Sequence, residues 1–119
     1  MENKVFAKQL EDRTRKFAIS IIKLSASLPD TTEGRVIRRQ ITSSGTSIGA
    51  NYREANRARS KADFTSRTGI CESEASETIY WLEIIEEMQW ISKQKLNPVM
   101  KESNEILAIF ASIGKTLKL

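Results

Sequence analysis

The sequence contains no histidine and only one cysteine, Cys71. Without histidine, the chain lacks the commonest general base and the commonest metal ligand of proteins. A single cysteine excludes an internal disulfide and any Cys-x-x-Cys site. This composition argues against histidine-based catalytic or metal chemistry, and it predicts a reducing compartment, the cytoplasm.

Glycine and proline are scarce, with 5 and 2 residues in a chain of 119. Few turns are therefore expected, and long helices are favoured. A chain of this length forms one domain, taken as residues 1–119, with one substantial core. The longest apolar stretch, LAIFASIG, is far short of the roughly 20 residues that a membrane span needs. The N-terminal residues also lack the apolar core of a signal peptide, so no membrane association is expected.

Four segments carry apolar residues at helical spacing. Thr32 is expected to cap the second segment. Ser60 is expected to cap the third, where Asp63 favours the helix start. Asn97 and Pro98 would begin the fourth, because proline suits the first helical position. The sequence thus predicts an all-α, antiparallel up-down-up-down four-helix bundle. The expected helices cover about residues 3–28, 33–58, 61–91 and 98–118.

The stretch SSGTSIGAN (residues 43–51) consists of poor helix formers and reads locally as a loop. Core positions nevertheless recur through it at steps of three and four residues, so a helix is predicted. Its small side chains would let a neighbouring backbone approach closely, although a kinked or frayed helix centre remains the alternative. The spacings of phosphate-binding loops, GxxxxGK[ST] and GxGxxG after a strand, are absent.

Charge is distributed unevenly along the chain, whose net charge is +4. Residues 33–62 carry 7 positive and 2 negative charges, and residues 63–90 carry 1 positive and 7 negative charges. These +5 and −6 segments could complement one another within a bundle or between subunits. Alternatively, they are two solvated faces of opposite sign.

Most cations of the +5 segment fall opposite the predicted core stripe, on the outer face of the second helix and at the turn that follows. We call this set the basic ribbon. It suits the binding of phosphates, although a solubilising face is the alternative. No aromatic side chain is interleaved, so base-specific recognition is not expected. The basic ribbon comprises Arg35, Arg39, Arg53, Arg57, Arg59 and Lys61.

Glu74 falls inside the apolar arc of the third helix, where a carboxylate must be paired, hydrogen-bonded or protonated. A structural polar network that fixes helix register is the leading interpretation. Without histidine, the ligand set of di-iron bundles cannot be completed, which leaves only an all-oxygen metal site as an alternative. No catalytic residue, metal or cofactor is expected, and Cys71 is expected to be a buried thiol. The predicted network comprises Gln40, Ser47, Asn51, Glu54, Glu74 and Glu77.

Three segments, QITSSGTSIGANYREA (40–55), RSKADF (59–64) and ICESEASETIYWLE (70–83), resemble the bacterial four-helix-bundle proteins known as 23S rRNA intervening-sequence proteins. The family pattern is Q-I-x-x-S-x-x-S-I-x-x-N-x-x-E, then S-x-x-D-F, then E-A-x-E-T-x-Y-W-L. This chain departs at Tyr52-Arg53, where the family often has Ile-Ala, and at Ser73, where it often has Lys. The matching residues are Gln40, Ile41, Ser44, Ser47, Ile48, Asn51, Glu54, Ser60, Asp63, Phe64, Glu74, Ala75, Glu77, Thr78, Tyr80, Trp81 and Leu82.

The resemblance implies an all-α bundle that assembles as a homo-oligomer, a pentamer in family members and in the related accessory proteins of diversity-generating retroelements. In those relatives the pentamer binds nucleic acid and a reverse transcriptase. The first hypothesis is therefore a non-enzymatic, oligomeric accessory protein that binds RNA through the basic ribbon. The second is a protein-interaction scaffold with no nucleic-acid role, and an enzyme is the least favoured.

Overall fold

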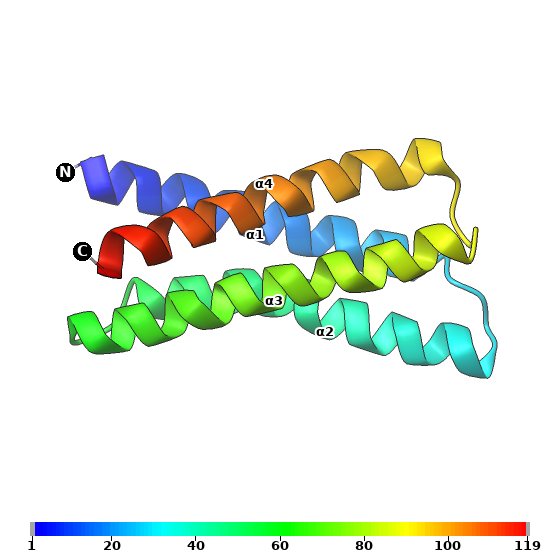
Figure 1. Cartoon of the computed structure of the whole chain (residues 1–119), viewed down its shortest axis with the longest axis horizontal. Coiled ribbons are helices and arrows are strands. Elements are labelled where there is room, and N and C mark those ends of the chain that lie inside the picture. Colours follow the sequence, from blue (N-terminus) through cyan, green and yellow to red (C-terminus); the bar gives the residue numbers. More distant parts are fainter. Residues whose placement is uncertain (1, 119) are drawn as a thin grey trace.

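A computed structural model describes the backbone of residues 2–118 and the side chains of residues 4–118. Four helices account for nearly all of this part of the chain: α1 (Glu2–Ser25), α2 (Thr32–Ala55), α3 (Lys61–Glu87) and α4 (Lys93–Lys118). They run alternately in opposite directions along the long axis (Figure 1). The bundle measures 45 × 24 × 22 Å. The predicted all-α four-helix bundle is confirmed.

Each helix contributes one apolar stripe to a shared core. Ile21, Ile41, Leu82 and Phe110, one from each helix, are completely buried. Burying a side chain of this size stabilises the fold by roughly 1.5–3 kcal/mol. The extensive helix–helix contacts join helices that are consecutive in sequence, and α1 and α4 share the smallest of the four interfaces.

The stretch 43–51 is helical throughout, as predicted, and lies in the middle of α2. Gly45 and Gly49 face α1. A Cβ at Gly45 would lie 2.8 Å from Cγ2 of Ile21, and one at Gly49 would lie 3.0 Å from Oγ1 of Thr14. The two glycines therefore allow a close approach of α1 that any larger residue would obstruct.

The starts of two helices differ from the prediction. Thr31, not Thr32, caps α2, because its side chain accepts a hydrogen bond from the backbone N–H of Gly34 at 3.0 Å. Ser60 caps α3 as predicted, accepting from the N–H of Asp63 at 3.0 Å. The other difference concerns α4.

Helix α4 begins at Lys93, so Pro98 lies inside the helix rather than at its first position. Ser92 accepts a hydrogen bond from the N–H of Lys95 through its side chain, at 3.4 Å. Leu96 is 1% exposed, and its burial favours the additional turn. Asn97 and Pro98 have residue types that suit a helix start, but they lie inside α4.

Helices α1, α2 and α3 all end earlier than predicted, at Ser25, Ala55 and Glu87. Leu28 and Ile91 lie beyond these ends and are nevertheless buried. The apolar pattern therefore continues past the helix itself. After α3, Gln89 adopts a left-handed conformation with φ of 58°, which ends the helical path.

Candidate nucleic-acid interface

The basic ribbon lies on the outer face of α2 and continues around the α2–α3 turn, and all of its side chains are exposed. Arg35 donates from Nε to Oδ1 of Asp30 at 2.7 Å, so it already has an anionic partner. Between residues 4 and 118, no carboxylate pairs with the remaining ribbon cations. Those cations are Arg39, Arg53, Arg57, Arg59 and Lys61.

Arg38 differs from the ribbon arginines because it has a structural role. Its guanidinium donates to the backbone carbonyl of Ser25 at 3.1 Å and to that of Leu28 at 2.7 Å. These carbonyls belong to the end of α1 and to the turn after it. Arg38 thereby satisfies acceptors that a helix C-terminus leaves without partners.

Two cations on α1 extend the basic surface and are absent from the ribbon predicted from the sequence. Lys8 and Arg15 line a groove of about 380 Å³ between α1 and α2, together with Arg53. Gly49 and Ala50 also line it. The seven-residue spacing of Lys8 and Arg15 places both on one face of α1. Which helix that face adjoins depends on how the helices pack. Residue spacing alone therefore could not identify Lys8 and Arg15 as part of the basic surface.

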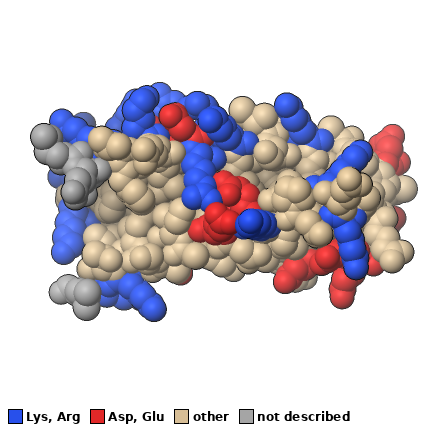
Figure 2. Space-filling model, turned by 90° about the horizontal axis from the view of Figure 1, so that it is seen from above, with Lys and Arg blue, Asp and Glu red and all other residues tan. Residues whose placement is uncertain are grey.

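The face formed by α1 and α4 carries both signs of charge. Figure 2 shows Lys and Arg side chains over much of the half nearest the chain termini, with Asp and Glu mainly near the middle and toward the other end. Arg13 of α1 bonds to Glu102 of α4 through two contacts of 2.7 Å, and its Nη2 lies 2.7 Å from Glu105. The hydrogen bonds that Arg13 donates to Glu102 are the main reason that the pKa of Arg13 is raised. Arg13 is therefore engaged between helices.

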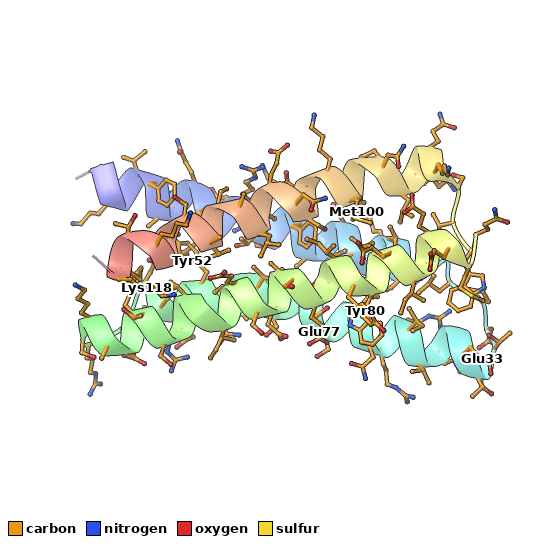
Figure 3. All side chains as sticks on the ribbon, viewed as in Figure 1. Glu33, Tyr52, Glu77, Tyr80, Met100 and Lys118 are labelled. Atoms are coloured by element: carbon orange, nitrogen blue, oxygen red, sulfur yellow. The ribbon has the colours of Figure 1, made fainter. Side chains whose placement is uncertain are left out.

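The residues of the predicted polar network do not form one network. Asn51 donates to Oγ of Ser47 at 2.9 Å, and both lie in α2. Glu77 accepts from Nε1 of Trp81 at 3.1 Å, and both lie in α3. Figure 3 shows Glu77 and Tyr80 on the outer side of α3.

The other three members, Gln40, Glu54 and Glu74, have no side-chain hydrogen bond to a described residue. Gln40 and Glu54 are exposed, and Glu74 is half-buried. Glu74 lies at the edge of α3, where water reaches its carboxylate, so it needs no buried partner. The hydrogen bonds of the predicted network therefore stay within α2 or within α3, and none of them links Glu74 to another helix.

A different pair provides the buried polar link between α2 and α3. Thr78 Oγ1 and Ser44 Oγ are 2.9 Å apart in the core. Nearby, the Cys71 thiol donates to the carbonyl of Ile48 at 3.4 Å. Burial raises the pKa of this thiol to about 12, so it is protonated at neutral pH. Cys71 is thus a buried thiol, as predicted, and not a nucleophile.

The outer side of α3 is acidic and partly apolar. It bears exposed carboxylates at Glu77, Glu83 and Glu87, and exposed side chains at Ile70, Tyr80 and Met88.

Within the described residues, no three Cys, Asp or Glu side chains gather as metal ligands. No helix there has the length and apolarity needed to cross a membrane.

Comparisons with known proteins agree with this architecture. The model of the family described as 23S rRNA-intervening sequence protein matches residues 8–112. The chain is also similar to a crystal structure of a protein with unknown function from the S23 ribosomal protein family of Bacteroides thetaiotaomicron VPI-5482. That similarity has a TM-score of 0.82 and 39% identity, over 88% of this chain and 97% of the other. Among curated proteins, none matches the chain.

Proposed function

The chain belongs to the 23S rRNA-intervening sequence protein family, and we propose that it is a non-enzymatic, oligomeric accessory protein that binds RNA in the cytoplasm. The observation that carries this proposal is the basic ribbon, five of whose six cations are exposed and unpaired by any described carboxylate. Cations that are not neutralised within the protein attract the phosphates of a nucleic acid.

The ribbon would hold the RNA by its phosphates. Arginine guanidinium groups offer planar pairs of donors that match phosphate oxygens. The ribbon contains no aromatic side chain on which a base could stack, so binding would depend little on sequence. Its affinity would come mainly from the release of counterions.

The first test measures binding of a labelled structured RNA by fluorescence anisotropy at about 50 and 200 mM salt. We expect micromolar or tighter binding at the lower salt and a steep loss at the higher. The log–log slope should be close to 0.9 for each phosphate neutralised. No binding at low salt would rule the proposal out.

A variant pair localises the contact. Arg53→Glu with Arg57→Glu should weaken binding to all RNA sequences alike, because both side chains belong to the ribbon. Lys93→Glu with Lys101→Glu changes the net charge equally on exposed residues of α4 and serves as the control. Equal losses in both variants would mean that net charge, and not the ribbon, governs binding.

Assembly belongs to the same proposal. A homo-oligomer, with five subunits as the resemblance implies, would place several ribbons side by side on one RNA. Effective concentration then strengthens binding without new contacts. The molar mass by light scattering, with and without RNA, tests the subunit number. A reverse transcriptase is a further candidate partner, which co-purification from cells would test.

A protein-interaction scaffold is the second candidate, and the acidic side of α3 favours it. Exposed Ile70, Tyr80 and Met88 beside carboxylates offer a surface on which the ribbon of another copy or a basic partner could dock. In that case high salt should dissociate the oligomer, and RNA should bind poorly. Light scattering over a salt series separates this outcome from the first.

A further inference from the structure

The groove between α1 and α2 combines two kinds of charge. Lys8, Arg15 and Arg53 line it, and so do Glu11 and Asp12. Carboxylates repel phosphates, so a groove that only held phosphates would be better without them. Their presence needs an explanation if the groove contacts nucleic acid.

The hydrogen bonds of these two carboxylates explain their presence in the groove. Oε2 of Glu11 accepts from Nδ2 of Asn56 at 2.8 Å. Oδ1 of Asp12 accepts from Nη1 of Arg15 at 3.1 Å. Each carboxylate is therefore held in place through one oxygen. Its other oxygen, Oε1 of Glu11 or Oδ2 of Asp12, has no hydrogen-bond donor among the described residues.

Both carboxylates are half-buried, whereas the three cations are exposed. The groove is thus lined both by carboxylates that keep one acceptor oxygen each and by exposed cations. A ligand that matches this arrangement has an anionic group for the cations and a hydrogen-bond donor for the carboxylates. A ribose phosphate has both, because its hydroxyls donate to carboxylates and its phosphate binds Lys and Arg.

The α2 side of the groove is lined by small residues. Gly49, Ala50 and Thr46 carry at most a methyl or a small hydroxyl side chain there. The volume of about 380 Å³ lies at the lower end of the range for small-ligand sites. The groove therefore suits one nucleotide unit rather than a helix or a protein loop.

We propose that the α1–α2 groove holds a ribonucleotide unit of an RNA chain. In this arrangement Lys8 and Arg53 bind the phosphate, Arg15 stays paired with Asp12, and Glu11 or Asp12 accepts a hydrogen bond from the ribose 2′-hydroxyl. This deepens the function proposed above and rests on it. The groove adds what the ribbon lacks, since the 2′-hydroxyl distinguishes RNA from DNA.

The experiment compares labelled single-stranded RNA and DNA of one sequence by anisotropy at one salt concentration. The intact protein should bind the RNA about tenfold more tightly, the effect of one hydrogen bond to a charged acceptor. The Asp12→Ala and Glu11→Ala variants, singly and together, should reduce this preference, while the affinity for DNA stays equal or rises.

Glu83→Ala is the control, because it removes one exposed carboxylate from α3, outside the groove. It should leave the ratio of RNA to DNA affinity unchanged. Circular dichroism establishes that each variant is folded, and alanine is a good helix former at all three positions.

The possible outcomes separate the two proposals. Equal, salt-sensitive binding of RNA and DNA by the intact protein would overturn the groove assignment and leave the phosphate-binding ribbon standing. An RNA preference that survives the double variant would also overturn it. Absence of binding to either nucleic acid at low salt would overturn both proposals.

A competitor identifies the source of the ribonucleotide. Adenosine monophosphate at micromolar concentration should not displace labelled RNA, because a single unit lacks the contacts that a chain makes along the ribbon. Displacement by this nucleotide but not by its 2′-deoxy form would replace the RNA chain with a free ribonucleotide as the ligand of the groove.

Discussion

The glycines of this protein show how one residue type serves opposite purposes. Gly45 is buried against Ile21, where a Cβ would lie 2.8 Å from a side-chain carbon. Gly69 lies on the exposed side of α3 and has no neighbouring atom within 4 Å of such a Cβ. The first is required by packing, and the second only weakens its helix.

Gly45→Ala should therefore destabilise the protein by roughly 1 kcal/mol, since overpacking exceeds the gain in helix propensity. Gly69→Ala should stabilise it by about 1 kcal/mol, because only the propensity gain remains. Urea unfolding of both variants beside the parent chain checks the opposite signs. A stabilising Gly45→Ala would mean that α1 does not approach α2 as closely as described.

Whether a side chain is buried or exposed was predictable where it depends only on the position of the residue around its own helix. Helical spacing placed four ribbon cations on the surface and Cys71 in the core. Those four cations are Arg35, Arg39, Arg53 and Arg57. Glu74 was predicted to be more buried than it is, because spacing gives an angle around a helix and not the distance to a neighbouring helix. Lys8 and Arg15 were missed for the same reason, since their importance depends on α2 lying beside them.

At the scale of whole helices, the starts and ends were less predictable than the helices themselves. Asn97 and Pro98 have the right residue types for a helix start, but α4 begins at Lys93. The burial of Leu96 outweighs the hydrogen bond that Pro98 cannot donate to the carbonyl of Gln94. Local residue preferences thus yielded to the core.

Pro98→Ala should consequently stabilise the protein, by roughly 1–3 kcal/mol, because it restores that hydrogen bond and removes the steric conflict of the ring. Thermal unfolding provides the measurement. Asn97→Ala, at the preceding exposed position, is the control and should change stability little. A loss of stability in Pro98→Ala would favour a helix that begins at Pro98.

Helices α1 and α4 share the smallest helix–helix interface, and ion pairs between side chains connect them. Arg13 contacts Glu102 and Glu105 at 2.7 Å, and its side chain is 36% exposed. A double-mutant cycle of Arg13→Ala and Glu102→Ala should give a coupling of about 0.5–1 kcal/mol at low salt. The coupling should shrink in 1 M salt, where charges are screened within about 3 Å. An unchanged coupling would mean that packing, not charge, joins these residues.

For the molecule as a whole, a single core predicts that the buried interior opens in one step. Cys71 is 0% exposed at the centre of that core and serves as a probe. A thiol-reactive dye at pH 8 should label it only through global unfolding. In low urea the logarithm of the labelling rate should rise linearly as the free energy of unfolding falls. Labelling that is independent of urea would reveal a local opening at α2 or α3.

The same thiol makes stability depend on pH. Its pKa rises from 9.0 to about 12 on folding, so above pH 9 the unfolded chain loses a proton that the folded chain retains. This stabilising contribution is complete below pH 9 and declines as the pH rises toward 12, by at most about 1.4 kcal/mol per unit. The difference in urea stability between the parent chain and Cys71→Ala, measured at pH 8 and pH 10, should therefore narrow at the higher pH.

Fold class followed from the sequence because four amphipathic stripes with short connections leave few arrangements. The groove and the unequal contacts between helices did not follow, since both arise from the relative positions of helices. A pattern read along one chain contains angles and lengths, but no distances between segments.

The unequal contacts also bear on the speed of folding. Every extensive helix–helix contact joins consecutive helices, and the slight one joins the first helix to the last. Each large interface can thus form by closing a short connection, at small entropic cost. Domains dominated by such local contacts fold in microseconds to milliseconds. The α1–α4 interface is expected to form last. It joins the segments farthest apart in sequence and is the smallest interface between helices.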